Sequence, residues 1–210
     1  MEKTEIKGWF SYRGVACMQT ADVADKVKKL LTSTNPNQVL EIGTASGGMT
    51  LLIRDLLNEL GLTETTLRSY DIRSDFNRTE LLKEIKQGGA IDFRLKNIFN
   101  HQYSELEEAE EVTEYIHRPG TTVVMCDGGS KKDEFRILSP LLKPGDIIMA
   151  HDYAANNEYF EKHIKDVVWN WHEIQDTDIE PSCLEHKLEP YLQEEFAKVV
   201  WACRRKLIQN

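Results

Sequence analysis

The chain is predicted to be an α/β protein built on a Rossmann-like, doubly wound sheet of seven strands, mostly parallel, with an antiparallel last strand. Three observations favour this fold. Apolar, strand-like runs alternate with segments of helical periodicity over most of the 210 residues, which implies parallel strands joined by right-handed crossovers. The first of these runs ends in a glycine-rich turn that opens a helix. The final strand follows a stretch without a clear helix, as expected for an antiparallel hairpin.

Local signals place the helices in chain order. The first helix is indicated by the spacing of the apolar residues Val23, Val27, Leu30 and Leu31. Gly61 is well placed to end a second helix over 48–60 in the left-handed conformation. Two further helices open at residue pairs with capping-box spacing, Asn77 with Glu80 and Ser104 with Glu107. Helical patterns near 133–142 and 157–169 flank the fifth strand.

The strands follow from short apolar runs bounded by turn residues. They are expected at 38–42, 66–71, 91–95, 121–126, 146–150, 171–174 and 196–203. Residues 176–193 are expected to be irregular or briefly helical, with prolines marking a loop. Because no repeat or linker divides the chain, we expect a single domain over 1–210, in which 1–35 form an N-terminal cap segment and the first helix.

Composition narrows the class of function. Hydrophobic residues make up 40% and charged residues 29% of the chain, an ordinary mixture for a soluble protein. The net charge of −9 argues against an extended nucleic-acid interface, which favours a basic surface. No apolar run is long enough to span a bilayer, and the N-terminus lacks the apolar core of a signal peptide. We expect a cytoplasmic protein that acts on a small molecule without a membrane partner, as a monomer or a homo-oligomer.

Two groups of residues invite a functional interpretation but are better explained structurally. The acid excess gathers in a predicted helix and is interpreted as its solvated face; its members are Glu105, Glu107, Glu108, Glu110, Glu111 and Glu114. No Cys-x-x-Cys pair occurs among the cysteines Cys17, Cys126, Cys183 and Cys203. Buried free thiols in a reducing compartment are therefore expected, and a zinc site is not.

The segment from Val39 to Gly48, VLEIGTASGG, is the most informative in the chain. A buried strand ends in an acid, and a glycine turn then opens a helix. Such a turn lets backbone N–H groups approach a ligand. The spacing Glu-x-Gly-x-x-x-Gly differs from the Gly-x-Gly-x-x-Gly of dinucleotide folds and resembles motif I of class I S-adenosylmethionine (SAM) dependent methyltransferases. That resemblance implies SAM as the cofactor, held near Glu41, Gly43, Thr44, Ala45 and Gly47.

The ends of the next strands offer further cofactor contacts. Asp71, at the tip of the second strand, is expected to accept hydrogen bonds from a ribose diol, although it could instead cap the following turn. Ile72 and Ile98 are expected to sandwich the adenine ring, with Asn97 hydrogen-bonding nearby. A buried carboxylate at Glu41 needs a partner. The ammonium group of SAM is one candidate, and the loop N–H groups are the alternative.

A second set of polar residues follows the fourth and fifth strands. Asp127 ends the fourth strand and the pair His151-Asp152 ends the fifth, so that the three converge on one point suited to a divalent cation. Over about 14–153 the ordered motifs resemble metal-dependent O-methyltransferases, including the catechol type, and most closely the branch of sugar O-methyltransferases and cephalosporin-hydroxylase-like proteins. The resemblance implies a divalent metal, Mg or Mn, held by Asp127, His151 and Asp152, with Asp127 also near the cofactor. The metal would lower the pKa of the substrate hydroxyl.

Three departures from that family leave alternatives open. His151 stands where an acid is usual, and imidazole suits metals such as manganese better than magnesium or acts as a general base. Met49 replaces a serine near the cofactor carboxylate. The catechol-type enzymes have a lysine base at the position of Ser130, and here Lys131 follows it. We treat Lys131 as a candidate catalytic base, with a solvated lysine at a helix start as the alternative.

The predicted function is SAM-dependent, metal-assisted O-methylation of a small hydroxylated substrate. One alternative is a metal-independent SAM methyltransferase with His151 as the base. Another is a SAM- or nucleotide-binding protein without transfer activity. A dehydrogenase fits the glycine spacing poorly. The N-terminal aromatic residues Trp9, Phe10 and Tyr12 either stack on the acceptor or fill a core edge or a dimer contact.

Overall fold

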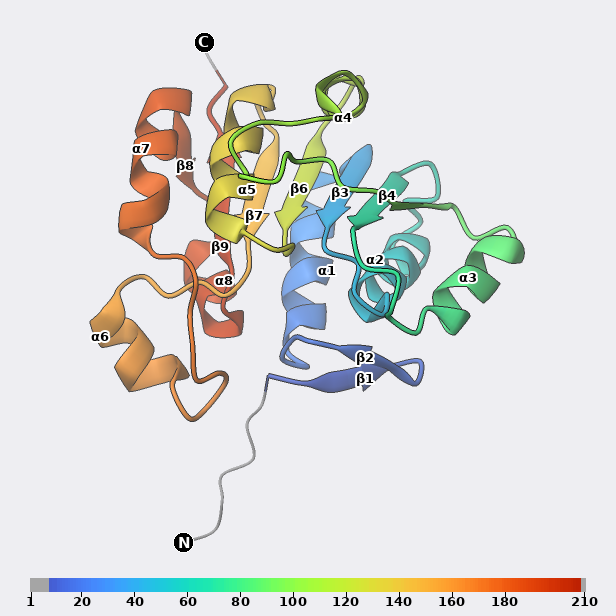
Figure 1. Cartoon of the computed structure of the whole chain (residues 1–210), viewed down its shortest axis with the longest axis horizontal. Helices are drawn as coiled ribbons and strands as arrows, with labels where there is room; N and C mark the ends of the chain where they lie inside the picture. Colours follow the sequence, from blue (N-terminus) through green and yellow to red (C-terminus); the bar gives the residue numbers. More distant parts are fainter. Residues whose placement is uncertain (1–7, 209–210) are drawn as a thin grey trace, which may run out of the picture.

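A seven-stranded sheet forms the centre of the molecule, and helices lie against both of its faces (Figure 1). The computed structural model describes residues 8–208. The strands lie side by side in the order β5-β4-β3-β6-β7-β9-β8. Five are parallel: β3 (Gln38–Ile42), β4 (Thr66–Asp71), β5 (Ile91–Leu95), β6 (Thr122–Cys126) and β7 (Ile147–Ala150). The sheet ends in two strands that pair antiparallel, β9 (Ala202–Lys206) and β8 (Leu188–Pro190).

The strand order reverses between β3 and β6. From β3 the chain builds β4 and β5 on one side, and then crosses to build β6 and β7 on the other. β3 and β6 are nevertheless direct neighbours, and their last residues, Ile42 and Cys126, are paired. Ligands of open α/β sheets bind outside the carboxyl ends of the strands at such a switch point. The predicted doubly wound, mostly parallel sheet is therefore confirmed, including its antiparallel end.

Alternate residues of the central strands enter two separate cores. Val39 and Met125 pack on the face that carries the first two helices, whereas Leu40 and Val124 pack on the opposite face. Parallel sheets need this coverage because both of their faces are apolar. The helices are α1 (Val23–Thr34), α2 (Gly48–Glu59), α3 (Thr79–Lys86), α4 (Ala109–Ile116), α5 (Lys131–Leu138), α6 (Asn157–Tyr159), α7 (Asp176–His186) and α8 (Gln193–Phe196).

A β-hairpin precedes α1 and was not predicted. Its strands are β1 (Phe10–Tyr12) and β2 (Val15–Cys17). Arg13 and Gly14 join them with positive φ angles of 52° and 76°, as a tight hairpin turn requires. In Figure 1 the hairpin lies below the carboxyl ends of the parallel strands. The expected N-terminal cap thus begins with this hairpin, while residues 1–7 of the expected segment lie outside the described residues.

The C-terminal third departs from the predicted elements. The segment over 176–193, expected to be irregular, contains α7, which opens with a capping box between Gln175 and Asp178 and accommodates Pro181. The expected strand over 196–203 is mostly helical turn, and β9 begins at Ala202. Val200 has a left-handed φ of 58°, which ends the turn. Here tertiary packing overrides the β preference of a Val-Val-Trp run.

Two further predictions are wrong in extent. The helix expected over 157–169 is reduced to α6 and a π-helical turn, Phe160–Ile164. The strand expected near 171–174 is reduced to one bridge between Tyr153 and Ile174. This stretch crosses the end of β7 as a loop, and it carries aromatic side chains toward the carboxyl edge of the sheet. Within residues 8–208, no helix combines the length and the apolar character needed to cross a membrane.

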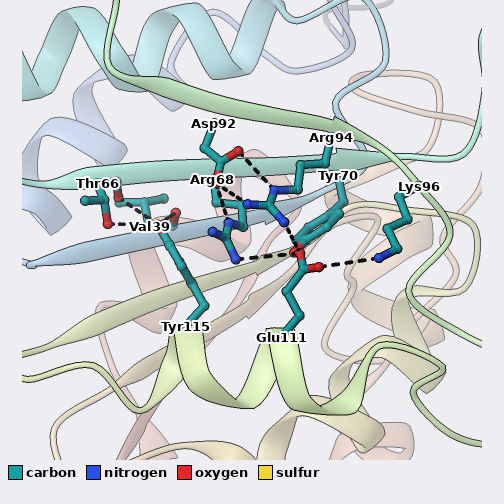
Figure 2. A network of polar contacts seen from close by, with 9 residues as sticks. All are labelled: Val39, Thr66, Arg68, Tyr70, Asp92, Arg94, Lys96, Glu111 and Tyr115. Atoms are coloured by element: carbon teal, nitrogen blue, oxygen red, sulfur yellow. Dashed lines mark hydrogen bonds and ion pairs between the residues drawn. The ribbon is translucent and has the colours of Figure 1, made fainter.

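The acidic helix α4 is attached to the sheet by one of its acids (Figure 2). Glu111 lies over β4 and β5, where it accepts hydrogen bonds from the Tyr70 hydroxyl and from Arg94 Nη1, the latter at 2.6 Å. Arg68 Nη1 is 3.7 Å from the same carboxylate and its Nε donates to Asp92 at 2.7 Å. The sequence analysis assigned Glu111 to a solvated helix face. Glu111 instead contacts the sheet and anchors the helix to it. The helix itself begins at Ala109 rather than near Ser104.

Candidate active site

A cavity of about 280 Å³ opens at the switch point of the sheet. Its wall is built from strand ends and from the segment after β2, so that residues distant in sequence face one space. The main lining segments are 16–19, 42–45, 70–73, 96–99, 127–129 and 151–152. Other lining residues are Gly48, Met49, Phe76, Tyr103, Lys131, Glu134, Trp169 and Trp171. The cavity therefore collects most of the residues that the sequence assigned to a cofactor and to chemistry.

The glycine turn after β3 is shaped by packing against β6. Gly43 has a φ of +94°, and a Cβ built on it would lie 2.0 Å from the carbonyl oxygen of Asp127. Gly47 also has a positive φ, precedes α2 and packs on Leu81. Gly43, Thr44 and Ala45 line the cavity, whereas Gly47 is not part of the lining. The lack of a Cβ at Gly43 thus lets the backbone after β3 approach the backbone after β6 closely, which is a structural role for this glycine.

The N–H groups of this turn already have partners in the protein. Those of Gly43 and Thr44 donate to the carbonyl oxygen of Tyr70 at 2.8 and 3.2 Å. That of Ala45 donates to Asp71 Oδ2 at 2.6 Å. The sequence-based expectation that these amides cradle a ligand therefore needs correction, because they hold the turn to β4.

Asp71 closes the turn and also lines the cavity. In addition to Ala45, its carboxylate accepts a hydrogen bond from the N–H of Arg73 at 2.7 Å, and Arg78 Nη2 lies 3.0 Å from Oδ2. The structural role that the sequence left as an alternative is thus present. A carboxylate has about four acceptor positions. The two N–H groups use two of these positions, and the Arg78 guanidinium neutralises the charge at Oδ2.

The residues expected around an adenine ring are brought together. Ile72, Asn97 and Ile98 all line the cavity. Ile72 is 56% exposed, whereas Ile98 is 2% exposed. The Asn97 Oδ1 atom accepts a hydrogen bond from the N–H of Phe99 at 3.1 Å. Two apolar side chains from adjacent strand ends therefore border one pocket.

Glu41 is buried behind the cavity wall and does not line it. Its Oε2 atom accepts hydrogen bonds from the hydroxyls of Thr50 at 2.6 Å and Ser69 at 2.5 Å. Burial raises the pKa of Glu41 to about 7, although these two hydrogen bonds act to lower it. The partners of Glu41 are thus side-chain hydroxyls rather than the loop N–H groups that the sequence suggested. The hydroxyl of Thr50 is thus engaged with Glu41 in the interior, and Thr50 does not line the cavity.

Asp127, His151 and Asp152 lie together at the ends of β6 and β7. The pairing of Cys126 with Ala150 sets the following residues side by side. His151 Nδ1 is 3.0 Å from Asp127 Oδ1 and 3.4 Å from Asp152 Oδ1. Asp152 has a left-handed φ of 54°, a strained conformation for a non-glycine residue and one that is common at functional sites.

Two successive hydrogen bonds hold the carboxylate of Asp127 in place. Gln19 Nε2 donates to Asp127 Oδ2 at 3.0 Å, and Trp201 Nε1 donates to Gln19 Oε1 at 2.8 Å. Gln19 is 1% exposed. No sequence pattern predicts these hydrogen bonds, because Gln19 and Trp201 belong to segments 182 residues apart. Both carboxylate oxygens of Asp127 therefore have partners within the protein.

The environment of Lys131 differs from the solvated helix start that the sequence left open as an alternative. Its Nζ atom is 3.0 Å from Asp152 Oδ2 and 3.2 Å from Glu173 Oε2, and its side chain is 13% exposed. It is therefore not a solvated lysine. Burial alone would lower the pKa of Lys131, but the charges of Asp127, Asp152 and Glu173 raise it above its usual value. The side chain is an ammonium ion at neutral pH, which disfavours a lysine base.

His151 is buried and carries an unsatisfied atom. Burial would lower its pKa, but the carboxylates of Asp127 and Asp152 outweigh this effect and raise the pKa of the imidazole above its usual value. Within the described part of the chain, three buried atoms of the cavity wall have no hydrogen-bond partner: His151 Nε2, Asp152 Oδ1 and Trp169 Nε1. Buried polar atoms without partners are rare and indicate catalytic groups or ligand contacts.

The predicted metal ligands do not fit a metal ion as they are arranged. Over residues 8–208, no group of three or more His, Cys, Asp or Glu side chains is placed to hold one. His151 Nδ1 contacts Asp127, whose other oxygen accepts from Gln19. Asp152 is paired with the ammonium of Lys131. The negative charge expected to bind a cation is thus matched by cationic and donor groups of the chain itself.

Two other residues near the site were missed or left undecided by the sequence. Glu173 contacts Lys131 from the loop after β7, a stretch that the sequence had assigned to a strand. Trp9 lies against Trp169, with ring centroids 5.9 Å apart, so the N-terminal aromatic segment does reach this region. Tyr12 instead donates a hydrogen bond to Asp55 at 2.7 Å, which places it at the edge of the core.

Comparisons with known proteins agree with this architecture. The sequence matches no protein-family model and no curated protein. Among solved structures, the apo form of CmcI-N160 superposes with a TM-score of 0.67 at 14% identity, covering 95% of this chain and 77% of that one. The Mg-SAM form of CmcI-D160 gives a TM-score of 0.64 at 13% identity, covering 93% and 76%.

An O-methyltransferase family protein from Burkholderia thailandensis superposes with a TM-score of 0.56 at 11% identity, covering 90% of this chain and 56% of that chain. At such identities the likeness concerns the fold. Together with the strand order, it shows that the chain has the Rossmann-like α/β fold of these structures.

Proposed function

We propose that this protein is a SAM-dependent methyltransferase that methylates a hydroxyl group of a small molecule. One observation carries the proposal. A single cavity joins the strand tips suited to a nucleoside, at Asp71, Ile72 and Ile98, to the buried pair of Asp127 and His151. The O-methyltransferases among the similar structures, and the SAM bound in one form of CmcI, support it as comparisons of fold.

The cavity wall fits the parts of SAM. Asp71 retains an acceptor position for a ribose hydroxyl, and the apolar side chains of Ile72 and Ile98 border the place for an adenine ring. Gly48 and Met49 bring the N-terminus of α2 to the cavity, where the helix dipole favours the carboxylate of the cofactor. When bound there, SAM supplies an electrophilic methyl group on a sulfonium.

The protein must also remove the proton of the acceptor hydroxyl. As the acceptor oxygen forms its bond to the methyl carbon, the bond from that carbon to the sulfonium sulfur would break and release the demethylated cofactor. The oxygen then loses its proton, and His151 is the base suited to receive it. Asp127 orients the ring through Nδ1, which leaves Nε2 as the nitrogen without a protein partner. A neutral imidazole with Nδ1–H bonded to a carboxylate carries its lone pair on Nε2. Asp127 and Gln19 are positioning residues in this scheme.

The test separates cofactor binding from transfer. Isothermal titration with SAM and with its demethylated product should show binding to the wild-type protein. Replacing Asp71 with Ala should weaken SAM binding by about tenfold or more, as expected for the loss of a charged hydrogen bond. Replacing His151 with Asn should leave SAM affinity nearly unchanged and lower methyl transfer to hydroxylated acceptors by about 100-fold.

Two results would count against the proposal in different ways. Failure of the wild-type protein to bind SAM would remove the cofactor and the reaction together. Binding of SAM without transfer to any member of a broad acceptor panel would favour a SAM-binding protein without catalytic activity. An unchanged rate in the His151 variant would leave methyl transfer intact and reject His151 as the base.

A further inference from the structure

The ammonium of Lys131 stands among three acids at the wall of the cavity. Asp152 Oδ2 and Glu173 Oε2 lie 3.0 and 3.2 Å from Nζ, and the charge of Asp127 acts on it as well. These acids come from three different segments: the ends of β6 and β7 and the loop after β7. Such a concentration of carboxylates at one point would be unfavourable without a cation. The cation here is a side chain of the protein.

Lys131 is held at both of its ends. Its backbone N–H donates to Glu173 Oε1 at 2.6 Å, while its side chain contacts the other oxygen of the same carboxylate. Because Lys131 is the first residue of α5, its N–H has no partner within the helix and is free for this contact. Glu173 thus clamps the backbone and the ammonium together. A side chain fixed in this way loses little further entropy when it contacts a substrate.

Lys131 lines the cavity, and its ammonium has more donors than its contacts use. An ammonium group has three N–H donors, and its two carboxylate contacts use two of them. The neighbouring Asp152 Oδ1 has no hydrogen-bond partner in the described residues and lies 3.4 Å from His151 Nδ1. A hydroxyl group of an acceptor molecule can therefore accept from Lys131 while His151 takes its proton, and the surrounding carboxylates repel an anionic acceptor. This pairing fits a neutral hydroxyl compound rather than a carboxylate or phosphate.

From this geometry we infer that the ammonium of Lys131 replaces a divalent metal at the acceptor oxygen, so that methyl transfer in this protein needs no metal ion. The inference rests on the proposed methyl transfer. The fixed positive charge stabilises negative charge as it develops on the acceptor oxygen, the contribution that a metal ion makes in related chemistry. Lys131 is thus a donor and an electrostatic stabiliser, and the proton goes to His151.

The same contacts explain why a metal ion is disfavoured. A cation bound between Asp127 and Asp152 would lie beside an ammonium already 3.0 Å from Asp152, and the two positive charges would repel each other. It would also displace His151 Nδ1 from Asp127. Removing the ammonium leaves the negative charges of Asp152 and Glu173 without their cationic partner. The Lys131 variant that lacks a charge is therefore expected to bind a divalent cation better than the wild-type protein does.

The neighbouring Lys132 provides a matched control. It lies on the same helix turn and also pairs with an acid, since its Nζ is 2.6 Å from Asp178 Oδ1, but its side chain is 54% exposed. It does not line the cavity. Replacing Lys131 or Lys132 with Met removes one charge from α5 in each case. Replacing Lys131 with Arg keeps the charge and serves as the conservative variant.

The experiment combines Mn²⁺ binding with methyl transfer in the presence of a chelator. By electron paramagnetic resonance, the wild-type and Lys132→Met proteins should bind little Mn²⁺, and the Lys131→Met protein should bind about tenfold more tightly. With the chelator present, wild-type transfer should be unchanged. Lys131→Met should lower kcat by about 100-fold with an unchanged Kd for SAM, and Lys131→Arg should restore part of it.

Specific outcomes would overturn the inference. These are loss of wild-type transfer on chelation, stoichiometric Mn²⁺ binding by the wild-type protein, equal Mn²⁺ binding by the wild-type and Lys131→Met proteins, or full transfer by Lys131→Met. Circular dichroism shows whether each variant is folded. If Lys131→Met does not fold, Lys131→Arg still tests the role of the positive charge. A protein that does not bind SAM in calorimetry fails the proposed function instead, while the Mn²⁺ titration still reports on the cation position.

Discussion

Glu41 is a carboxylic acid within a fully buried strand, and its surroundings determine its charge. Two hydroxyl groups donate to it, but burial dominates and raises its pKa to about 7. The protonated form is therefore favoured in the folded protein over a range in which the unfolded chain is ionised. An acid that the sequence assigned to the cofactor thus acts mainly on the stability of the sheet.

Replacing Glu41 with Gln is expected to remove part of the pH dependence of stability. Because the folded pKa is raised, the contribution of Glu41 is fully present below the unfolded pKa and is lost as the pH rises through about 7. The loss is at most about 3.5 kcal/mol, because the pKa of Glu41 rises from 4.5 to about 7 and each pKa unit corresponds to about 1.4 kcal/mol. The free energy of unfolding, measured with urea from about pH 5 to pH 8, should fall less steeply in the variant.

Glu110→Gln is the control for this measurement, since Glu110 is exposed. Glu134, a second buried acid whose pKa burial raises to about 7, contributes the same slope to every protein in the series. The difference between the two curves therefore isolates Glu41. Parallel curves for the wild-type and Glu41→Gln proteins would mean that Glu41 is not protonated in the folded state.

The residues that the sequence could assign to the site are those that end a strand or directly follow one. Asp71, Asp127 and His151 were found because parallel strands end at one edge, so position along the chain predicts proximity in space. Gln19 and Glu173 could not be found in this way. Each belongs to an irregular segment whose path is set by tertiary packing, and a lone Gln or Glu in such a segment carries no periodic signal.

At the level of elements, the attachment of α4 shows how an acidic helix can be held to a sheet. The outer strands β4 and β5 present Arg68, Arg94 and Tyr70 to the helix, and Glu111 is their common partner (Figure 2). Tyr115, one helix turn further on, donates to the carbonyl oxygen of Val39 at 3.0 Å. Polar contacts therefore accompany the apolar packing of this helix.

Replacing Glu111 with Ala is expected to destabilise the protein by about 1–2 kcal/mol, because it leaves Arg94 Nη1 and the partly buried Tyr70 hydroxyl without their acceptor. The same change at Glu110, which is exposed on the same helix, should alter stability by less than about 0.5 kcal/mol. Urea unfolding of the two variants measures the difference. Equal losses of stability would show that the contacts of Glu111 with the sheet contribute no more than those of an exposed acid.

The elements that sequence patterns placed correctly are the five parallel strands and the helices between them. Their periodicities are long and agree with the buried face that each presents. The C-terminal elements were misplaced because local preference and packing disagree there. Val199, Val200 and Trp201 favour a strand by composition, yet they fill the core as a turn before β9. Pro181 indicated a loop, yet it is tolerated within α7.

For the whole molecule, the contact between the ends of β3 and β6 is the critical junction. Gly43 follows β3 at the point where Asp127 follows β6, and the N–H of Asp127 donates to the carbonyl oxygen of Ile42 at 2.9 Å. The cavity opens directly over this junction. Any residue that separates the two strand ends therefore affects both the stability of the sheet and the shape of the site.

Replacing Gly43 with Ala is expected to destabilise the protein by more than about 3 kcal/mol, because the new Cβ would overlap backbone atoms and the residue must keep a positive φ. Gly61 also has a positive φ, of 72°, but a Cβ there meets nothing within 4 Å. Its replacement with Ala should therefore lower stability by only about 1 kcal/mol. Urea unfolding distinguishes the two, and similar losses would show that backbone strain alone, without overlap, sets the effect at Gly43.

The distribution of tryptophan gives the molecule a built-in optical reporter. Trp169 lies 4.7 Å from Trp171 and 5.9 Å from Trp9 between ring centroids, and Trp201 is 4.9 Å from the His151 ring. Trp169 and Trp171 line the cavity, Trp9 contacts Trp169 and Trp201 contacts His151, which also lines the cavity. A molecule that enters the cavity therefore contacts two indoles, and we expect it to change their fluorescence and near-ultraviolet ellipticity together. Occupancy can be followed in real time without attaching a dye.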